Sequence, residues 1–367
     1  MTGVISACRY PVYLHLQDAD SPRDHRRKPL IRRRPTDWSQ RWRHAFQIAF
    51  LLLNAALGAQ FYLWVRQIEV RGSALHVSRP PGVEGWLPIA GLMNLKYWVL
   101  TGRIPAIHPA AMFLLVAILA IAFLFRKAFC SWLCPVGTVS EALGSIGRKI
   151  LGRNLRLPKW IDVPLRGFKY LLLGFFVWAV ASMSAQAIEA FMQSPYGLIA
   201  DVKMLNFFRF IGGTGLCVIG LLGIASIFVA DFWCRYLCPY GALLGLVSLL
   251  SPARIRRDTN ACIDCGKCAK ACPASLPVDR LPSVRSAECN ACVACVAVCP
   301  VEGALDLSLR RPVRRRLFAP ALAAAIILLF VGVVGFARTT GHWRSRVPES
   351  SYRQLVSHSE EVGHPMP

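Results

Sequence analysis

The sequence lacks the features that mark several common classes of protein. Residues 1–44 contain no apolar run for the core of a cleavable signal peptide, so we expect the first apolar helix to remain as an anchor. Paired histidines inside apolar runs are also missing. Only His44 and His108 lie near the ends of such runs, on opposite sides of the membrane, which argues against a bis-histidine haem. There is no P-loop, dinucleotide-binding fingerprint or nucleophile triad either.

Acidic residues are scarce, because 20 Asp and Glu stand against 43 Lys and Arg, a formal net charge of +23. Such a balance can accompany nucleic-acid binding, and residues 23–43 are rich in Arg and contain two tryptophans. The positive-inside rule explains the charge better, since basic residues flank membrane helices on the cytoplasmic side. We therefore expect a membrane protein that does not bind nucleic acid.

Hydrophobic residues make up 54% of the chain, more than an ordinary soluble globule contains. They gather in five runs, each near the ~20 residues that cross a ~30 Å hydrocarbon core: 45–65, 109–126, 168–187, 211–230 and 317–337. The predicted fold class is an α-helical integral membrane protein with about five transmembrane helices. The placement of Lys and Arg favours a multi-pass protein of the bacterial cytoplasmic (inner) membrane, with a cytoplasmic N-terminus and a periplasmic C-terminus.

These runs divide the chain into eight segments. The first four are a basic, mobile cytoplasmic arm (1–44), a helical hairpin (45–126), a cytoplasmic loop with a cysteine motif (127–167) and a second hairpin (168–230). The last four are a second cysteine motif (231–253), a cysteine-rich domain (254–309), a basic flank with the fifth helix (310–337) and a periplasmic tail (338–367). Gly and Pro in the loop 66–108 predict irregular structure there.

The strongest motif is a run of four cysteines that occurs twice within residues 262–299. Each copy reads C-x2-C-x2-C-x3-C-P, the pattern of bacterial two-cluster ferredoxins, in which the fourth cysteine binds the other cluster. One [4Fe-4S] cluster is therefore assigned to Cys262, Cys265, Cys268 and Cys299, and the other to Cys289, Cys292, Cys295 and Cys272. Structural zinc sites also use four thiolates, but this spacing favours iron and sulfide. We expect an inserted α+β ferredoxin-like domain on the cytoplasmic side.

A second cysteine motif, C-x3-C-P, also occurs twice, with its copies 104 residues apart. Residues 129–137 match residues 233–241, and each copy follows a helical hairpin, so we expect two parallel repeats in the membrane. Cysteines four residues apart share a helix face, and the proline pushes the cysteine before it out of helical geometry and ends the helix.

If the two repeats pack side by side, their cysteines form one shared redox metal site. Its ligands would be Cys130, Cys134, Cys234 and Cys238, holding either a further Fe-S cluster or another metal. The nearby basic residues Arg126, Lys127 and Arg235 should favour thiolates. Dithiol or copper chemistry and simple structural capping remain open alternatives at this site.

Two membrane C-x3-C-P motifs followed by two ferredoxin runs resemble the membrane polyferredoxin family, the NapH, NosR and RdxA/FixG type of 4Fe-4S protein. The resemblance covers about 110–305. It implies electron transfer between a cytoplasmic or quinone donor and a partner reductase or maturation system, by an electron-transfer component and not a stand-alone catalyst. The chain lacks room for the flavin domain of NosR or the immunoglobulin-like domain of FixG, and its fifth helix departs from the four-helix plan of NapH. The physiological partner therefore cannot be carried over.

Two further possibilities stay open from the sequence. A rival function is a metal-handling factor that reduces or delivers copper or iron during assembly of a membrane oxidase or periplasmic metalloenzyme. If a quinone binds, Glu189 and Asp201 near the outer end of the third run are candidates for its protonation, although carboxylates there are usually only hydrated. In the tail, Trp343 and Tyr352 are expected to dock on the outer membrane interface or on a partner.

Overall fold

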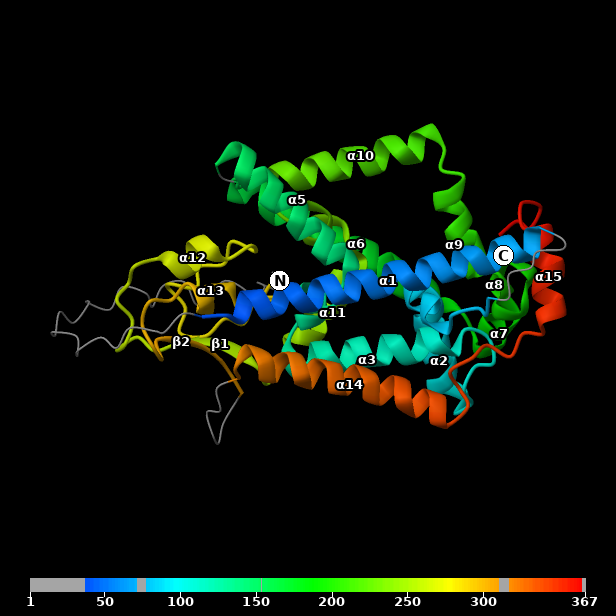
Figure 1. The fold of residues 1–367 in the computed structure, drawn as a ribbon. Coiled ribbons are helices and arrows are strands. Elements are labelled where there is room, and N and C mark those ends of the chain that lie inside the picture. The colour runs from blue at the N-terminus through cyan, green and yellow to red at the C-terminus, as the bar shows by residue number, and fades with distance from the viewer. Residues whose placement is uncertain (1–36, 71–76, 153, 310–316, 365–367) are drawn as a thin grey trace, which may run out of the picture.

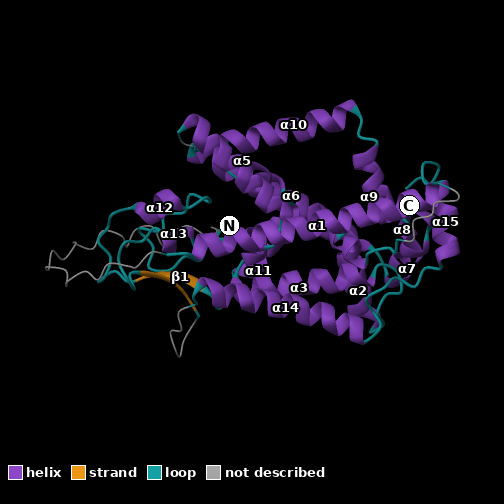
Figure 2. Cartoon of the chain, viewed as in Figure 1, coloured by secondary structure: helices purple, strands orange, loops and turns teal. Residues whose placement is uncertain are grey.

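A bundle of long helices carries a small cysteine-rich domain at one end and short capping helices at the other (Figure 1). This computed structural model describes residues 37–70, 77–152, 154–309 and 317–364. Most of the predicted basic arm, and the arginine cluster within 310–316, lie outside the described residues. Helices dominate, and the few strands belong to the cysteine-rich end (Figure 2).

Three helices of the described chain are long and apolar enough to cross a membrane by themselves. They are α1 (Ser39–Glu69), α6 (Lys159–Ser182) and α14 (Ala319–Thr339). A fourth span arises if α9 (Ala200–Arg209) and α10 (Gly213–Phe228), which meet at 82°, are taken together. The protein is thus a helical membrane protein.

The remaining predicted span corresponds to α3 (Pro109–Phe125), which is strongly apolar but has only 17 residues. At 1.5 Å per residue it is about 26 Å long, short of a ~30 Å hydrocarbon core. Most of its side chains are buried between α2 (Pro88–Thr101), α11 (Pro239–Ser248) and α14. It therefore forms the centre of the bundle.

Three expectations about the flanking segments need correction. Helix α1 begins at Ser39, so the last residues of the predicted arm are helical. The described part of the outer loop is largely helical and not irregular, because it folds into the 3-10 helix η1 (Pro81–Trp86) and α2. Each has a proline in the first turn, where its missing N–H costs nothing. The tail forms α15 (Glu349–Ser357), and its Tyr352 and Trp343 are buried inside the protein. Tyr352 packs edge-on against Trp64 of α1, with ring centroids 5.5 Å apart.

The two C-x3-C-P repeats pack reciprocally. In the first, α3 is followed by α4 (Ala128–Trp132) and α5 (Pro135–Leu151). In the second, α10 is followed by the π-helix η2 (Trp233–Leu237) and α11. Helix α5 packs on α10 of the other repeat, while α11 packs on α3 of the first. This exchange is the arrangement expected of two parallel repeats related by a two-fold axis.

The cysteine-rich domain is built on one antiparallel strand pair, β1 (Arg254–Arg257) and β2 (Leu305–Ser308), with Arg254 opposite Ser308. Two short helices, α12 (Lys267–Ala271) and α13 (Ala294–Ala297), pack together beside it. Its interior is continuous with the membrane part, because Val293 and Leu305 share one hydrophobic cluster with Ile121 and Trp132. The domain is therefore fused to the bundle and is not merely tethered to it.

The opposite end is closed by α7 (Ala185–Gln193), α8 (Pro195–Leu198), α9 and α15 (Figure 1). Fully buried Asp201 lies 2.6 Å from the Arg79 guanidinium, which also lies 2.8 Å from Glu84. Because such a buried pair is costly to break, it holds η1 and α9 together. The N-terminal end of α1 lies with the cysteine-rich domain, whereas α15 lies at the far end.

Candidate functional site

The first ferredoxin run surrounds a small space, and the first three cysteines of the second run lie elsewhere in the domain. One small cavity is lined by Cys262, Cys265 and Cys268 of the first run together with Cys299, the fourth cysteine of the second run. Cys265 is exposed to solvent, whereas Cys289, Cys292 and Cys295 are buried. The first space is thus near the surface of the domain, and the second run lies in its interior.

Cys272 lies with the second run. Burial raises the pKa of the Cys292 thiol to about 12, and negative charge on Cys272 and Cys289 acts in the same direction. Burial also raises the pKa of Cys295, with Cys292, Cys289 and Cys272 adding to it. Neutral thiols bind iron poorly, so cluster iron would have to supply the free energy that ionises them.

In each C-x3-C-P motif the second cysteine caps a helix. Cys134 and Cys238 have extended backbones, as expected before a proline, and directly precede α5 and α11. The amide of Gly241 donates a hydrogen bond to Sγ of Cys238 at 3.2 Å. The first-turn amides and the helix dipole favour negative charge at these two sulfurs. The proline therefore ends one helix and also starts the next, and only the first of these was predicted from the C-x3-C-P spacing.

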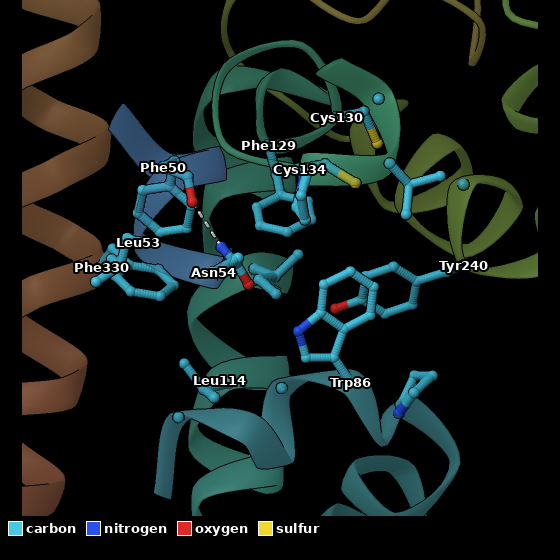
Figure 3. A pocket seen from close by; sticks show the side chains of 18 of the residues that line it. Phe50, Leu53, Asn54, Trp86, Leu114, Phe129, Cys130, Cys134, Tyr240 and Phe330 are labelled. Atoms are coloured by element: carbon cyan, nitrogen blue, oxygen red, sulfur yellow. Dashed lines mark hydrogen bonds between the residues drawn. The ribbon is translucent and has the colours of Figure 1, made fainter. Parts of the chain in front are cut away.

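All four C-x3-C-P cysteines line one cavity of about 630 Å³, together with Tyr240, Phe129 and Trp86. Figure 3 shows Cys130 and Cys134 on one side of this cavity and Trp86 and Leu114 on the opposite side. From the thiols the lining runs along the apolar faces of α1 and α14 as far as Arg338 and Trp343. Among the described residues, however, no three His, Cys, Asp or Glu side chains lie close enough to hold a single metal ion.

The expected activation of these thiols by basic neighbours is outweighed by burial. Burial raises the pKa of Cys130 to about 12, although Lys127 acts against it, and raises that of Cys134 to about 11. Arg235 is engaged elsewhere, with its guanidinium 2.9 Å from the Asp162 carboxylate. The basic residues alone therefore do not make thiolates here.

The second ferredoxin run is docked directly on the first C-x3-C-P motif. Ser131 and Trp132, between Cys130 and Cys134, donate hydrogen bonds to the carbonyls of Asn290 at 2.5 Å and Ala291 at 3.2 Å. Gln40 of α1 donates to the Cys292 carbonyl at 3.0 Å. This loop, which carries Cys289 and Cys292, is thus held against the four-cysteine cavity.

An ion pair reinforces the same junction. Lys169 of α6 places Nζ 2.7 Å and 2.8 Å from the two carboxylate oxygens of Glu288, the residue before Cys289. The Lys169 side chain is fully buried and that of Glu288 is 13% exposed. Lys127 and Lys169 hold the pKa of Glu288 below its usual range, although burial opposes them.

The acidic residues suggested for quinone chemistry lie elsewhere. Asp201 is paired with Arg79, and Glu189 is exposed near the Tyr97 hydroxyl at 3.3 Å, and neither lines the cavity. The cavity is lined instead by Glu141, Asp231 and Glu288. Two of these carboxyls could have been found from their nearness to the cysteines in the sequence. Asp231 precedes Cys234 by three residues, and Glu141 follows Cys134 within two helical turns.

Comparison with known proteins bears on both cysteine motifs. A family model described as a 4Fe-4S binding domain matches residues 107–154 and 211–257, which confirms the predicted internal repeat. A 4Fe-4S dicluster domain matches residues 254–300. No solved structure matches the chain.

Several relatives extend the comparison. The putative electron transport protein YccM of Escherichia coli is 52% identical over 335 residues, 89% of this chain and 94% of that protein. The ferredoxin-type protein NapH of Haemophilus influenzae is 25% identical over 267 residues, 70% of this chain and 85% of that protein. The methylamine utilization ferredoxin-type protein MauN of Paracoccus denitrificans is 30% identical over 151 residues, 40% of this chain and 48% of that protein.

Proposed function

Because this chain belongs to the membrane polyferredoxin-type family of 4Fe-4S proteins, we propose that it relays single electrons between the cysteine-lined cavity in its membrane part and a redox partner at its ferredoxin end. An iron-sulfur electron-transfer role follows from the family itself. The observation that supports this path is the docking of the second ferredoxin run on Ser131 and Trp132, beside the four-cysteine cavity.

Two [4Fe-4S] clusters would be held with crossed ligands. The sets are Cys262, Cys265, Cys268 and Cys299, and Cys289, Cys292, Cys295 and Cys272. The cavity that joins Cys299 to the first run, and the charge coupling of Cys272 to the second, support this crossing. When bound, such clusters supply one-electron carriers whose potentials depend on burial and on hydrogen bonds to sulfur.

The four C-x3-C-P cysteines would hold a third centre. Cys130, Cys134, Cys234 and Cys238 line one cavity, and the family model that matches both repeats is described as 4Fe-4S binding. Helix N-termini at Cys134 and Cys238 favour an anionic centre. In this proposal the first cluster, beside the exposed Cys265, would lie nearest a partner, the second would lie between, and the third would adjoin the cavity.

The electron donor we favour is a lipid-soluble quinol. A cavity of about 630 Å³ with an aromatic and aliphatic lining lies in the size range of small-molecule sites, ~300–1,000 Å³. All twelve ligand cysteines lie toward the ferredoxin end, so a hydrophobic carrier that enters the cavity would meet the relay without a further protein centre. The partner would be a reductase or maturation system.

The orientation is part of the same proposal. We place the start of α1 and the ferredoxin domain in the cytoplasm and α15 in the periplasm, with five crossings made by α1, the short α3, α6, the α9–α10 pair and α14. The positive-inside bias and the separation of α15 from the ferredoxin domain support this orientation.

Iron and sulfide counting with EPR, on protein purified anaerobically, tests the proposal. We expect about twelve irons per chain in the wild type and about eight in a variant with Cys130, Cys134, Cys234 and Cys238 changed to Ala. Cys217→Ala, an exposed cysteine of α10, is the matched control and should keep the wild-type count. About eight irons in both proteins would overturn the third centre. Copper bound only by the wild type would favour the metal-handling alternative.

A further inference from the structure

Three carboxyl groups line the four-cysteine cavity, and two of them are neutralised by a cation. Glu141 accepts hydrogen bonds from the Arg43 guanidinium and from Gln47 at 2.9 Å. Glu288 is paired with Lys169 at 2.7 Å. Among the described residues Asp231 makes no ion pair, and no hydrogen bond joins its carboxyl to a cysteine.

Asp231 lies in the turn between α10 and η2, where its backbone is strained. Its φ of 57° lies in the left-handed region that residues other than Gly rarely adopt. Strain of this kind costs of order 1–3 kcal/mol and persists where the surrounding structure fixes it, often at functional sites. The turn holds this carboxyl at the wall of the cavity.

Burial and one neighbouring carboxylate oppose the ionisation of Asp231. Burial comes first and the negative charge of Glu141 second, and together they raise the pKa of Asp231 to about 6. Arg148 of α5 and Arg235 of η2 act in the opposite sense, Arg43 of α1 also faces it, and Cys234 is its titratable neighbour on η2. The two largest causes of the raised pKa of Asp231, burial and Glu141, do not involve the cysteines.

The neighbouring Glu141 behaves in the opposite way. Burial would raise its pKa, but Arg43 and Gln47 lower it to about 2, so Glu141 stays charged. Two carboxyls in one cavity whose environments separate their titrations are typical of acid-base sites, where one group exchanges protons and the other sets the field.

We propose that Asp231 is the proton acceptor of the cavity and takes the protons released when a hydroquinone is oxidised there. This inference rests on the proposed use of a quinol. The hydroquinone loses two electrons and two protons and becomes a quinone. Each electron would leave through the centres that the four C-x3-C-P cysteines and the second ferredoxin run would hold, with a one-electron carrier protein as the final oxidant. Each O–H bond that breaks gives its proton to a carboxylate oxygen of Asp231, which passes it to water before the next transfer.

Anaerobic stopped-flow reduction of the full-length protein by a short-chain hydroquinone tests this assignment. The bleaching of the iron-sulfur absorbance is recorded between pH 5 and 8. In the wild type the rate should rise with pH through about 6, because the acceptor must be ionised. In Asp231→Asn the rate should fall at least tenfold at pH 7 and lose this pH dependence, while reduction by dithionite stays unchanged.

Two further variants make the test specific. Asp231→Glu keeps a carboxyl and should recover most of the rate with a shifted pH midpoint. Glu189→Gln removes a carboxyl outside the cavity and should match the wild type. If Asp231→Asn loses iron on purification, the midpoint in Asp231→Glu decides, and an unshifted midpoint overturns the assignment.

The outcomes separate this inference from the proposed function. If dithionite reduces the wild type but hydroquinone does not, a quinol is not the donor. The proposed role of Asp231 is then refuted as well. A wild type reduced by hydroquinone, with Asp231→Asn equal to it in rate and pH profile, would refute Asp231 alone.

Discussion

Replacing Lys169 by Met should weaken the attachment of the second ferredoxin run to the membrane helices. The substitution keeps the length of the side chain and removes the ammonium that lies 2.7 Å and 2.8 Å from the Glu288 oxygens. Since only 13% of the Glu288 side chain is exposed, its carboxylate would be left buried without its partner. Removing one member of a buried pair costs roughly 3–5 kcal/mol. Because Lys127 also stabilises the Glu288 charge, we expect the lower end, about 3 kcal/mol.

A double-mutant cycle measures this coupling. Thermal or denaturant unfolding in detergent, and the rate of iron release to a chelator, are compared for the wild type, Lys169→Met, Glu288→Gln and the double variant. The double variant should recover at least 1 kcal/mol of the loss, because it removes the unpaired charge. Additivity of the two single effects within about 0.5 kcal/mol would refute the reasoning.

The pH dependence provides a second check on the Lys169–Glu288 pair. The pKa of Glu288 is lowered in the folded protein, so its ionised form stabilises the fold above the ordinary carboxyl pKa. This stabilisation of the fold is lost as the pH falls through the lowered pKa that Glu288 has in the folded protein. The stability gap between wild type and Lys169→Met should therefore shrink on acidification.

Three other substitutions test the membrane part. Gly147→Ala would place a Cβ 1.8 Å from the Ile227 carbonyl oxygen where α5 crosses α10, and should cost roughly 1–3 kcal/mol in thermal unfolding. Gly174→Ala in α6 meets nothing within 4 Å and should be neutral or stabilising by up to about 1 kcal/mol, and equal effects at both positions would contradict the close crossing. Glu141→Gln should destabilise the protein at pH 7 and much less near pH 3, because the pKa of Glu141 falls from 4.5 to about 2 on folding and its stabilisation is lost over that interval. An equal loss at both pH values would show that the Glu141 charge does not contribute.

The spacing of cysteines predicted more of the site than the hydrophobic pattern did. Cluster ligation needs fixed local turns, so C-x2-C-x2-C-x3-C-P predicts both ligand runs and their crossing. The extended backbone of Cys134 and Cys238 also followed from a local rule, the clash of a proline with the residue before it.

What the sequence could not predict depends on contacts between distant segments. Composition shows that α3 is apolar but not that it lies at the centre, because buried and lipid-facing helices have similar sequences. The thiols were expected to be activated by charge, but burial at Cys130 depends on segments that meet only in the folded chain. The roles of Glu141 and Asp231 likewise arise from one cavity formed by segments far apart in sequence.

The docking of the second ferredoxin run on Ser131 and Trp132 has a consequence for biosynthesis. The two partners in each hydrogen bond are 159 residues apart, so the ribosome completes the first hairpin long before Asn290 and Ala291 emerge. The ferredoxin half therefore matures against a surface that is already inserted in the bilayer. Excision of residues 254–309 would leave Val293 and Leu305 without the helices that cover them, so the excised piece should aggregate in place of becoming a soluble ferredoxin.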